Sequence, residues 1–148
     1  MSFQLKKTNW KNLILRQVFA KLHLSHSFHK LRGIMSKKIN WGYFRNGWTS
    51  CKRAQEVLDA RNISVENRVI ANKEKIDSKD AWELLQSASL IRTGKGKKTN
   101  VWNPSIDAKE EILKDVIGPS GNLRAPAWKV GTEFIVGFNP ELYHEMFG

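Results

Sequence analysis

The chain has 148 residues, of which 41% are hydrophobic and 26% charged, so one globular domain is feasible and wholesale disorder is excluded. Its single cysteine, Cys51, excludes an intramolecular disulfide and a cysteine-based zinc site, and it fits a reducing, cytoplasmic location. No apolar run approaches the ~18 residues that span a bilayer, so no membrane partner is expected.

The net charge of +11 is unevenly distributed along the chain. Residues 1–34 hold seven of the 25 Lys and Arg residues and no acidic residue, which leaves 18 basic and 14 acidic residues for the remainder. This small excess is a weak reason to expect nucleic acid, which we do not predict as a partner. The composition divides the chain into a basic N-terminal extension, residues 1–36, and a domain, residues 37–148.

Three interpretations of the extension remain open. A basic, acid-free composition is typical of a presequence, and also of a solvated or membrane-surface arm, and apolar residues at i, i+4 from Trp10 to Leu22 are compatible with an amphipathic helix. The third interpretation, which we favour, is that translation starts at Met35, directly before the first expected strand. The three histidines of the extension do not share one helical face, so we predict no metal site there.

The domain begins with a strand and a helix. The aromatic-rich residues 39–44 predict a strand, which Gly47 ends. Thr49 or Ser50 is expected to cap a helix that runs to about residue 61.

A second strand and a second helix follow. Residues 64–70 predict the strand, and Asp77 or Ser78 is expected to cap the helix, whose apolar stripe ends at Ala88. Strand, helix, strand and helix in this order predict a parallel βαβ unit.

The C-terminal part alternates less regularly. Residues 92–98 form a basic segment that predicts a hairpin or a connector, and residues 108–117 predict a third helix. Two apolar runs, residues 127–130 and 133–137, are separated by the two residues of a tight hairpin turn. Asn139 is expected to cap the last helix, because proline and glutamate follow it in the first turn.

The start of the helix at residue 49 has the pattern of a redox site. A thiol oxidoreductase places its nucleophile at a helix N-terminus, where unpaired N–H groups and the positive dipole end favour an anion, and a second reactive group at i+3. Residues 48 and 51 have this spacing. Lys52 and Arg53 are expected to lower the pKa of a neighbouring thiol further.

Four segments carry a resemblance to a known family: residues 45–56 (RNGWTSCKRAQE), 94–98 (GKGKK), 118–126 (GPSGNLRAP) and 136–139 (VGFN). In this order they resemble the arsenate reductase and Spx-like branch of thioredoxin-fold proteins, and most closely the arsenate-reductase-family branch that includes selenoproteins. The resemblance covers about residues 37–148. It implies an α/β, thioredoxin-like fold with a central mixed four-stranded sheet flanked by helices, and no cofactor.

The chain departs from the family pattern at Trp48. The resemblance implies a catalytic pair in which a cysteine or selenocysteine at position 48 is the nucleophile and Cys51 resolves the intermediate, but an indole cannot attack a disulfide. One explanation, which we favour, is that a UGA selenocysteine codon has been read as tryptophan. The other is a true substitution, which leaves a redox-inactive domain or a one-thiol protein that depends on Cys51.

The resemblance also implies a substrate-binding loop. Pro126 is expected to follow a cis peptide bond, and Ala125 to offer its backbone to the substrate chain. Arg124 is interpreted either as a fork for an oxyanion or carboxylate, or as a solvated loop residue. The predicted substrate-binding set is completed by Thr49, Ser50 and Arg53.

These observations predict a glutaredoxin-like, thiol- or selenol-dependent disulfide oxidoreductase. Its expected partners are a protein or small-molecule disulfide or oxyanion substrate and a cellular thiol reductant. Arsenate itself is less well supported, because only Arg53, Arg92 and Arg124 can be suggested around the nucleophile. The alternative is a redox-inactive, Spx-like binding or regulatory module that holds an acidic protein.

Overall fold

The computed structural model of the protein describes residues 38–148, and the predictions made for the N-terminal extension lie outside them. In chain order, the elements are β1 (Lys38–Phe44), α2 (Thr49–Ala60), β2 (Ser64–Ile70), α3 (Ser78–Leu85), β3 (Leu90–Lys95), β4 (Lys98–Trp102), α4 (Lys109–Val116), β5 (Ala127–Val130), β6 (Glu133–Phe138) and α5 (Pro140–Phe147). None of the helices in this part of the chain combines the length and the apolar character needed to cross a bilayer.

The strands form one mixed sheet in the order β2-β1-β5-β6-β3-β4. β1 pairs in parallel with β2 and β3 pairs in parallel with β6, while the other neighbours are antiparallel. The predicted α/β class is therefore confirmed, and the mixed sheet has six strands where the prediction had four. The basic segment after α3 is a hairpin, and its first strand extends the sheet because it hydrogen-bonds to the edge of β6.

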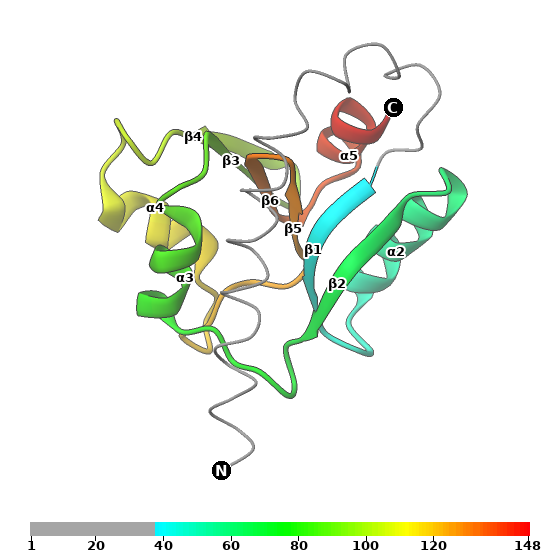
Figure 1. The fold of residues 1–148 in the computed structure, drawn as a ribbon, viewed down its shortest axis with the longest axis horizontal. Coiled ribbons are helices and arrows are strands. Elements are labelled where there is room, and N and C mark those ends of the chain that lie inside the picture. The colour runs from blue at the N-terminus through cyan, green and yellow to red at the C-terminus, as the bar shows by residue number, and fades with distance from the viewer. Residues whose placement is uncertain (1–37) are drawn as a thin grey trace.

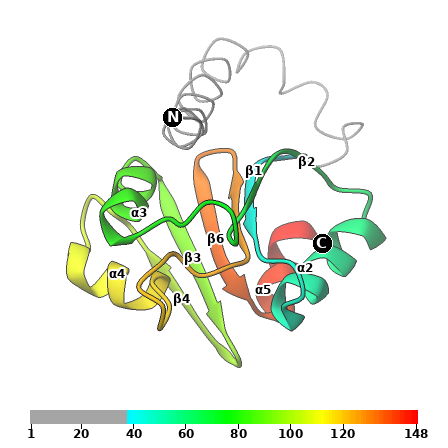
Figure 2. The ribbon, with the colours of Figure 1, turned by 90° about the horizontal axis from the view of Figure 1, so that it is seen from below.

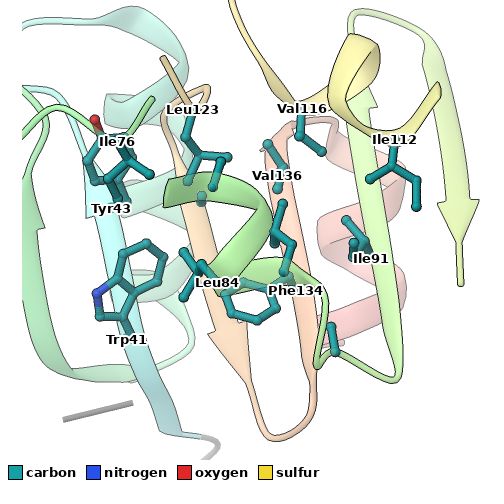
Figure 3. Packing of buried hydrophobic residues seen from close by; sticks show 14 of the residues in the cluster. Trp41, Tyr43, Ile76, Leu84, Ile91, Ile112, Val116, Leu123, Phe134 and Val136 are labelled. Carbon is teal, nitrogen blue, oxygen red and sulfur yellow. The ribbon is translucent and has the colours of Figure 1, made fainter. Parts of the chain in front are cut away.

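Helices cover both faces of the sheet (Figures 1 and 2). α3 and α4 pack on one face, as Figure 3 shows, and α2 and α5 pack on the other. β6 is buried on both faces, because Phe134 and Val136 point toward α3 and α4 while Ile135 belongs to the cluster beneath α2 and α5. Such double burial explains why the central strands read as continuous apolar runs rather than as alternating ones.

Two helix N-termini follow the expected cap chemistry. Asp77 precedes α3, and its side chain accepts a hydrogen bond from the Asp80 N–H (2.9 Å), so Asp77 rather than Ser78 is the cap. Asn139 precedes α5 and accepts from the Leu142 N–H at the same distance. Both side chains satisfy a backbone donor that would otherwise lack a partner in the first helical turn.

Asp115 connects α4 to the β3–β4 hairpin. One of its carboxylate oxygens accepts hydrogen bonds from the side chains of Thr93 (2.5 Å), Trp102 (2.7 Å) and Asn100 (3.0 Å). Burial alone raises the pKa of the Asp115 carboxyl, but these three donors and the charge of Arg124 outweigh it, so the pKa lies below its usual value. The native fold therefore favours the ionised carboxylate.

We expect Asp115→Asn to destabilise the fold by about 1–2 kcal/mol at pH 7, because a charged acceptor of three hydrogen bonds is lost. A carboxyl whose folded pKa is lowered contributes stability above its unfolded pKa, and that contribution disappears as the pH falls through the folded pKa. Urea unfolding at pH values from 7 down to about 3 should therefore show the difference between the variant and the parent shrinking on acidification. Asp59→Asn, on an exposed part of α2, is the control, and a pH-independent difference for Asp115→Asn would contradict the prediction.

Candidate functional site

The site lies at the edge of the sheet where β1 and β2 end. Parallel strands bring their carboxyl ends to the same edge, and the Ala71 N–H just after β2 donates to the carbonyl of Phe44 at the end of β1 (2.8 Å). β5 runs antiparallel to β1, with Ala127 opposite Tyr43. The loop that leads into β5 therefore reaches the same edge as the start of α2.

Residue 48 is the N-cap of α2. Its backbone is extended (φ −87°, ψ 134°), and its carbonyl accepts the first helical hydrogen bond from the Lys52 N–H (3.0 Å). The predicted caps, Thr49 and Ser50, are wrong, because both residues already lie inside the helix and no side chain caps it. The Trp48 side chain is 47% exposed, and the Arg45 guanidinium carbon lies 4.3 Å from the centroid of its ring.

Cys51 lies in the first turn of α2, directly below residue 48, with 7% of its surface exposed. Its Sγ accepts a hydrogen bond from the Arg45 N–H (3.3 Å). Burial raises the pKa of the Cys51 thiol, and this outweighs the Arg45 hydrogen bond and charge, which act to lower it. The expectation that Lys52 and Arg53 would lower this pKa is wrong, because both residues are exposed and only Arg45 acts to lower the pKa, through its N–H and its charge.

We expect Cys51 to be protonated and slow to react at neutral pH. With iodoacetamide, the protein should be alkylated more slowly than free cysteine at pH 7, because the thiolate is the reactive form and the sulfur is buried. The rate should continue to rise above the ordinary cysteine pKa of about 8.5. Mass spectrometry of the alkylated protein provides the readout, and a rate that levels off below this pH would contradict the assignment.

The peptide bond between Ala125 and Pro126 is cis, as predicted. The Pro126 carbonyl accepts from the Gly137 N–H in β6 (2.7 Å), which holds the loop against the sheet. Among the described residues, the Ala125 N–H and carbonyl have no hydrogen-bond partner. Both backbone groups of the residue before the proline are therefore left without an internal partner in this part of the chain.

The three candidate arginines have different environments. Arg124 donates to the carbonyls of Asp115 and Gly94 (3.2 Å each); burial lowers its pKa and Asp115 opposes this. Arg92 forms an ion pair with Glu133 (3.1 Å), and Arg53 is exposed on α2. Only Arg124 is therefore brought to the site, and it is partly buried rather than a solvated loop residue.

A hollow of about 560 Å³ opens beside residue 48. Of the predicted site residues, Trp48, Ser50, Arg124 and Ala125 line it. Thr49 is exposed and, like Arg53, does not line the hollow.

Cys51 does not line this hollow. It lines a neighbouring one of about 440 Å³, and Arg45 lines both. Positions 48 and 51 therefore lie one turn apart on α2 but line different hollows. Arg45 lies between them.

Arg45 and Lys75 were not among the predicted site residues, yet both line the larger hollow. Each follows the carboxyl end of one of two neighbouring parallel strands, β1 and β2, a position where ligand-binding residues gather in open α/β sheets. Their place after the two predicted strands was therefore the signal that could have identified them.

Within residues 38–148, no three His, Cys, Asp or Glu side chains come together as potential metal ligands. Comparisons of the chain with protein-family models, with curated proteins and with solved structures find no match. What the site does is therefore inferred from its own geometry and chemistry.

Proposed function

We propose that the domain has a thioredoxin-like fold. Four of its strands, in the order β2-β1-β5-β6, support this proposal, because β1 and β2 are parallel whereas β5 is antiparallel to both of its neighbours. α2 follows the first strand, and the cis proline directly precedes β5, in the positions that the family resemblance implies. The β3–β4 hairpin extends this arrangement beyond β6.

The function that fits best is a thiol- or selenol-dependent disulfide oxidoreductase of the arsenate-reductase-like class. One observation carries this proposal. Residue 48 is exposed at the tip of α2, one turn from buried Cys51, and both it and the residue before the cis proline line the same hollow. This arrangement suits a nucleophile at position 48, a resolving thiol at position 51 and a substrate chain along Ala125.

The chemistry transfers two electrons to the substrate. A selenolate at position 48 attacks one sulfur of a disulfide, so that a selenium–sulfur bond forms and the other sulfur leaves as a thiolate. Cys51 then gives up its proton to solvent and its sulfur attacks the selenium, which links positions 48 and 51 and releases the second substrate sulfur as a thiolate. Solvent protonates both products, and two thiols of a cellular reductant reduce the 48–51 bond.

The surroundings favour position 48 as the first nucleophile and Cys51 as the resolving thiol. A group at position 48 has the Arg45 cation beside it and the N-terminus of a helix behind it, and both stabilise an anion. Cys51 is buried with a raised pKa, so it does not compete for the first attack. These surroundings support the proposal that the natural residue at position 48 is selenocysteine, because tryptophan has no reactive group.

Two measurements test this assignment. The natural protein should contain selenium, and the mass of the proteolytic peptide that spans residue 48 should be that of selenocysteine, with a UGA codon in the gene. The variant Trp48→Cys should reduce a peptide disulfide in the presence of a dithiol at least about 100-fold faster than the protein with tryptophan. A UGG codon together with equal rates for the two proteins would refute the oxidoreductase proposal.

The second candidate is a redox-inactive binding module. The packing of Arg45 on Trp48 favours it, because a cation over an indole face stabilises an exposed aromatic surface. In that case Trp48 is an anchor for a partner and Cys51 is part of the core. Selenium in the natural protein would exclude this candidate.

A further inference from the structure

The hollow beside residue 48 is lined by basic residues and by no acidic residue. Arg45, Lys75 and Arg124 contribute the cations, and serine, asparagine, tyrosine and backbone groups form much of the remainder. Arg124 already donates to two carbonyl groups, and Arg45 packs on residue 48. Lys75, in the connection from β2 to α3, is exposed and has no acidic partner among residues 38–148.

We propose that Lys75, supported by Arg45, selects substrates in which the reactive disulfide lies in an acidic segment of a protein. This inference rests on the proposed function, because it concerns what the oxidoreductase site accepts. A carboxylate beside the reactive cysteine of the substrate would form an ion pair with Lys75. No acidic residue among those described in the hollow would repel it. Lys75 is therefore a specificity-determining residue and takes no part in the bond-breaking steps.

The occupant is a polypeptide because of the loop that borders the hollow. The backbone N–H and carbonyl of Ala125 have no partner among the described residues, and Ala125 lines the hollow together with residue 48. An extended substrate chain that hydrogen-bonds to these groups would place its reactive cysteine beside residue 48. The neighbouring side chains of that chain then lie over the hollow, within the range of Lys75.

The β3–β4 hairpin is the competing source of positive charge. Lys95, Lys97 and Lys98 are exposed around its turn, but none of them lines the hollow. Lys97→Glu therefore makes the same change of net charge as Lys75→Glu without touching the hollow. The pair of variants separates a local contact from a general electrostatic attraction.

The experiment uses the full chain with Trp48→Cys, reduced beforehand, in single turnover. Three peptides differ only in the two residues that flank their single cysteine. Both flanking residues are Glu in the first peptide, Gln in the second and Lys in the third. In each peptide the cysteine forms a mixed disulfide with 2-thiopyridine. The release of the thiopyridine gives the second-order rate constant. The Lys75→Glu and Lys97→Glu variants are measured with the same three peptides. Comparing the variants with the parent for each peptide removes any intrinsic difference in peptide reactivity.

We expect the Glu peptide to react roughly fivefold faster than the Gln peptide at low salt. This ratio should decrease as the salt concentration rises, because salt screens the ion pair between the peptide carboxylate and Lys75. Lys75→Glu should reverse this preference and favour the Lys peptide, while Lys97→Glu should keep it. A preference that is unchanged by Lys75→Glu, or is lost equally in Lys97→Glu, would overturn the inference but leave the oxidoreductase proposal standing.

A failure of the proposed function has a different signature. In that case no peptide reacts faster with Trp48→Cys than with the protein that carries tryptophan. Fluorescence anisotropy of labelled, cysteine-free Glu and Gln peptides, measured with the tryptophan protein and with its Lys75→Glu variant, then decides the docking question alone. Tighter binding of the Glu peptide that depends on Lys75 would support the acidic specificity, and equal binding would refute it.

Discussion

Replacing Cys51 with serine in the Trp48→Cys background is expected to stop turnover after the first chemical step. The nucleophile at position 48 would still attack the disulfide, but no second thiol would lie one helical turn away to release the product. The mixed disulfide should accumulate at residue 48, and steady-state turnover should fall by about two orders of magnitude, as expected when one member of a catalytic pair is lost.

Intact-mass spectrometry during a single turnover measures this effect directly. The Cys51→Ser protein should carry one substrate adduct, while the parent should carry none after the reaction. Glu56→Ser, on an exposed position of the same helix, controls for the change in helix propensity. Unchanged turnover in the Cys51→Ser protein would mean that Cys51 is only a buried core residue and that resolution comes from an external thiol.

The largest effect on stability is expected from Gly137→Ala. Gly137 has a positive φ (+86°), its N–H donates to the Pro126 carbonyl, and its own carbonyl accepts from the Tyr143 hydroxyl (2.9 Å). A Cβ at this position would overlap the carbonyl oxygen of Gly94 on the neighbouring strand and lie 3.1 Å from the Arg124 guanidinium. Because the obstacle is backbone of a paired strand, it cannot move away as a flexible side chain could.

We expect Gly137→Ala to lower the free energy of unfolding by at least about 3 kcal/mol, from the strained φ together with the clash. Gly121→Ala is the matched control, because Gly121 also has a positive φ (+79°) but nothing within 4 Å of an added Cβ. Gly121→Ala should lower the free energy of unfolding by about 1 kcal/mol, because it introduces only the strain of the positive φ. Urea unfolding of both variants gives the comparison, and equal losses would show that the clash relaxes at no cost.

The proposed acidic specificity and the proposed redox chemistry depend on different residues of the site. Arg45 packs on residue 48 and its N–H donates to the sulfur of Cys51, so in the proposed mechanism it belongs to the reacting centre. Lys75 comes from a different connection, and it lines only the larger hollow whereas Arg45 lines both. A substitution at Lys75 can therefore change which substrate is accepted without removing a group that the chemistry needs.

Much of the fold could be predicted because its signals are local. The cap Asn139, and the cap Asp77 as one of two candidates beside Ser78, follow from side chains that bond their own helix, and the cis bond before Pro126 follows from the segment that resembles the family. The cap of α2 was misplaced, because Thr49 and Ser50 are good caps by chemistry whereas the turn at Gly47 (φ +83°) starts the helix one residue earlier.

The sequence by itself determined the order of strands and helices, the spacing of positions 48 and 51 and the place of the proline, because each depends on residues close together in the chain. Only the tertiary structure decided that the β3–β4 hairpin joins the sheet, that Cys51 is buried with a raised pKa, and that Lys75 shares a hollow with Arg124. These properties arise from packing between segments that are distant in the chain, and neither periodicity nor local propensity reports which segments meet.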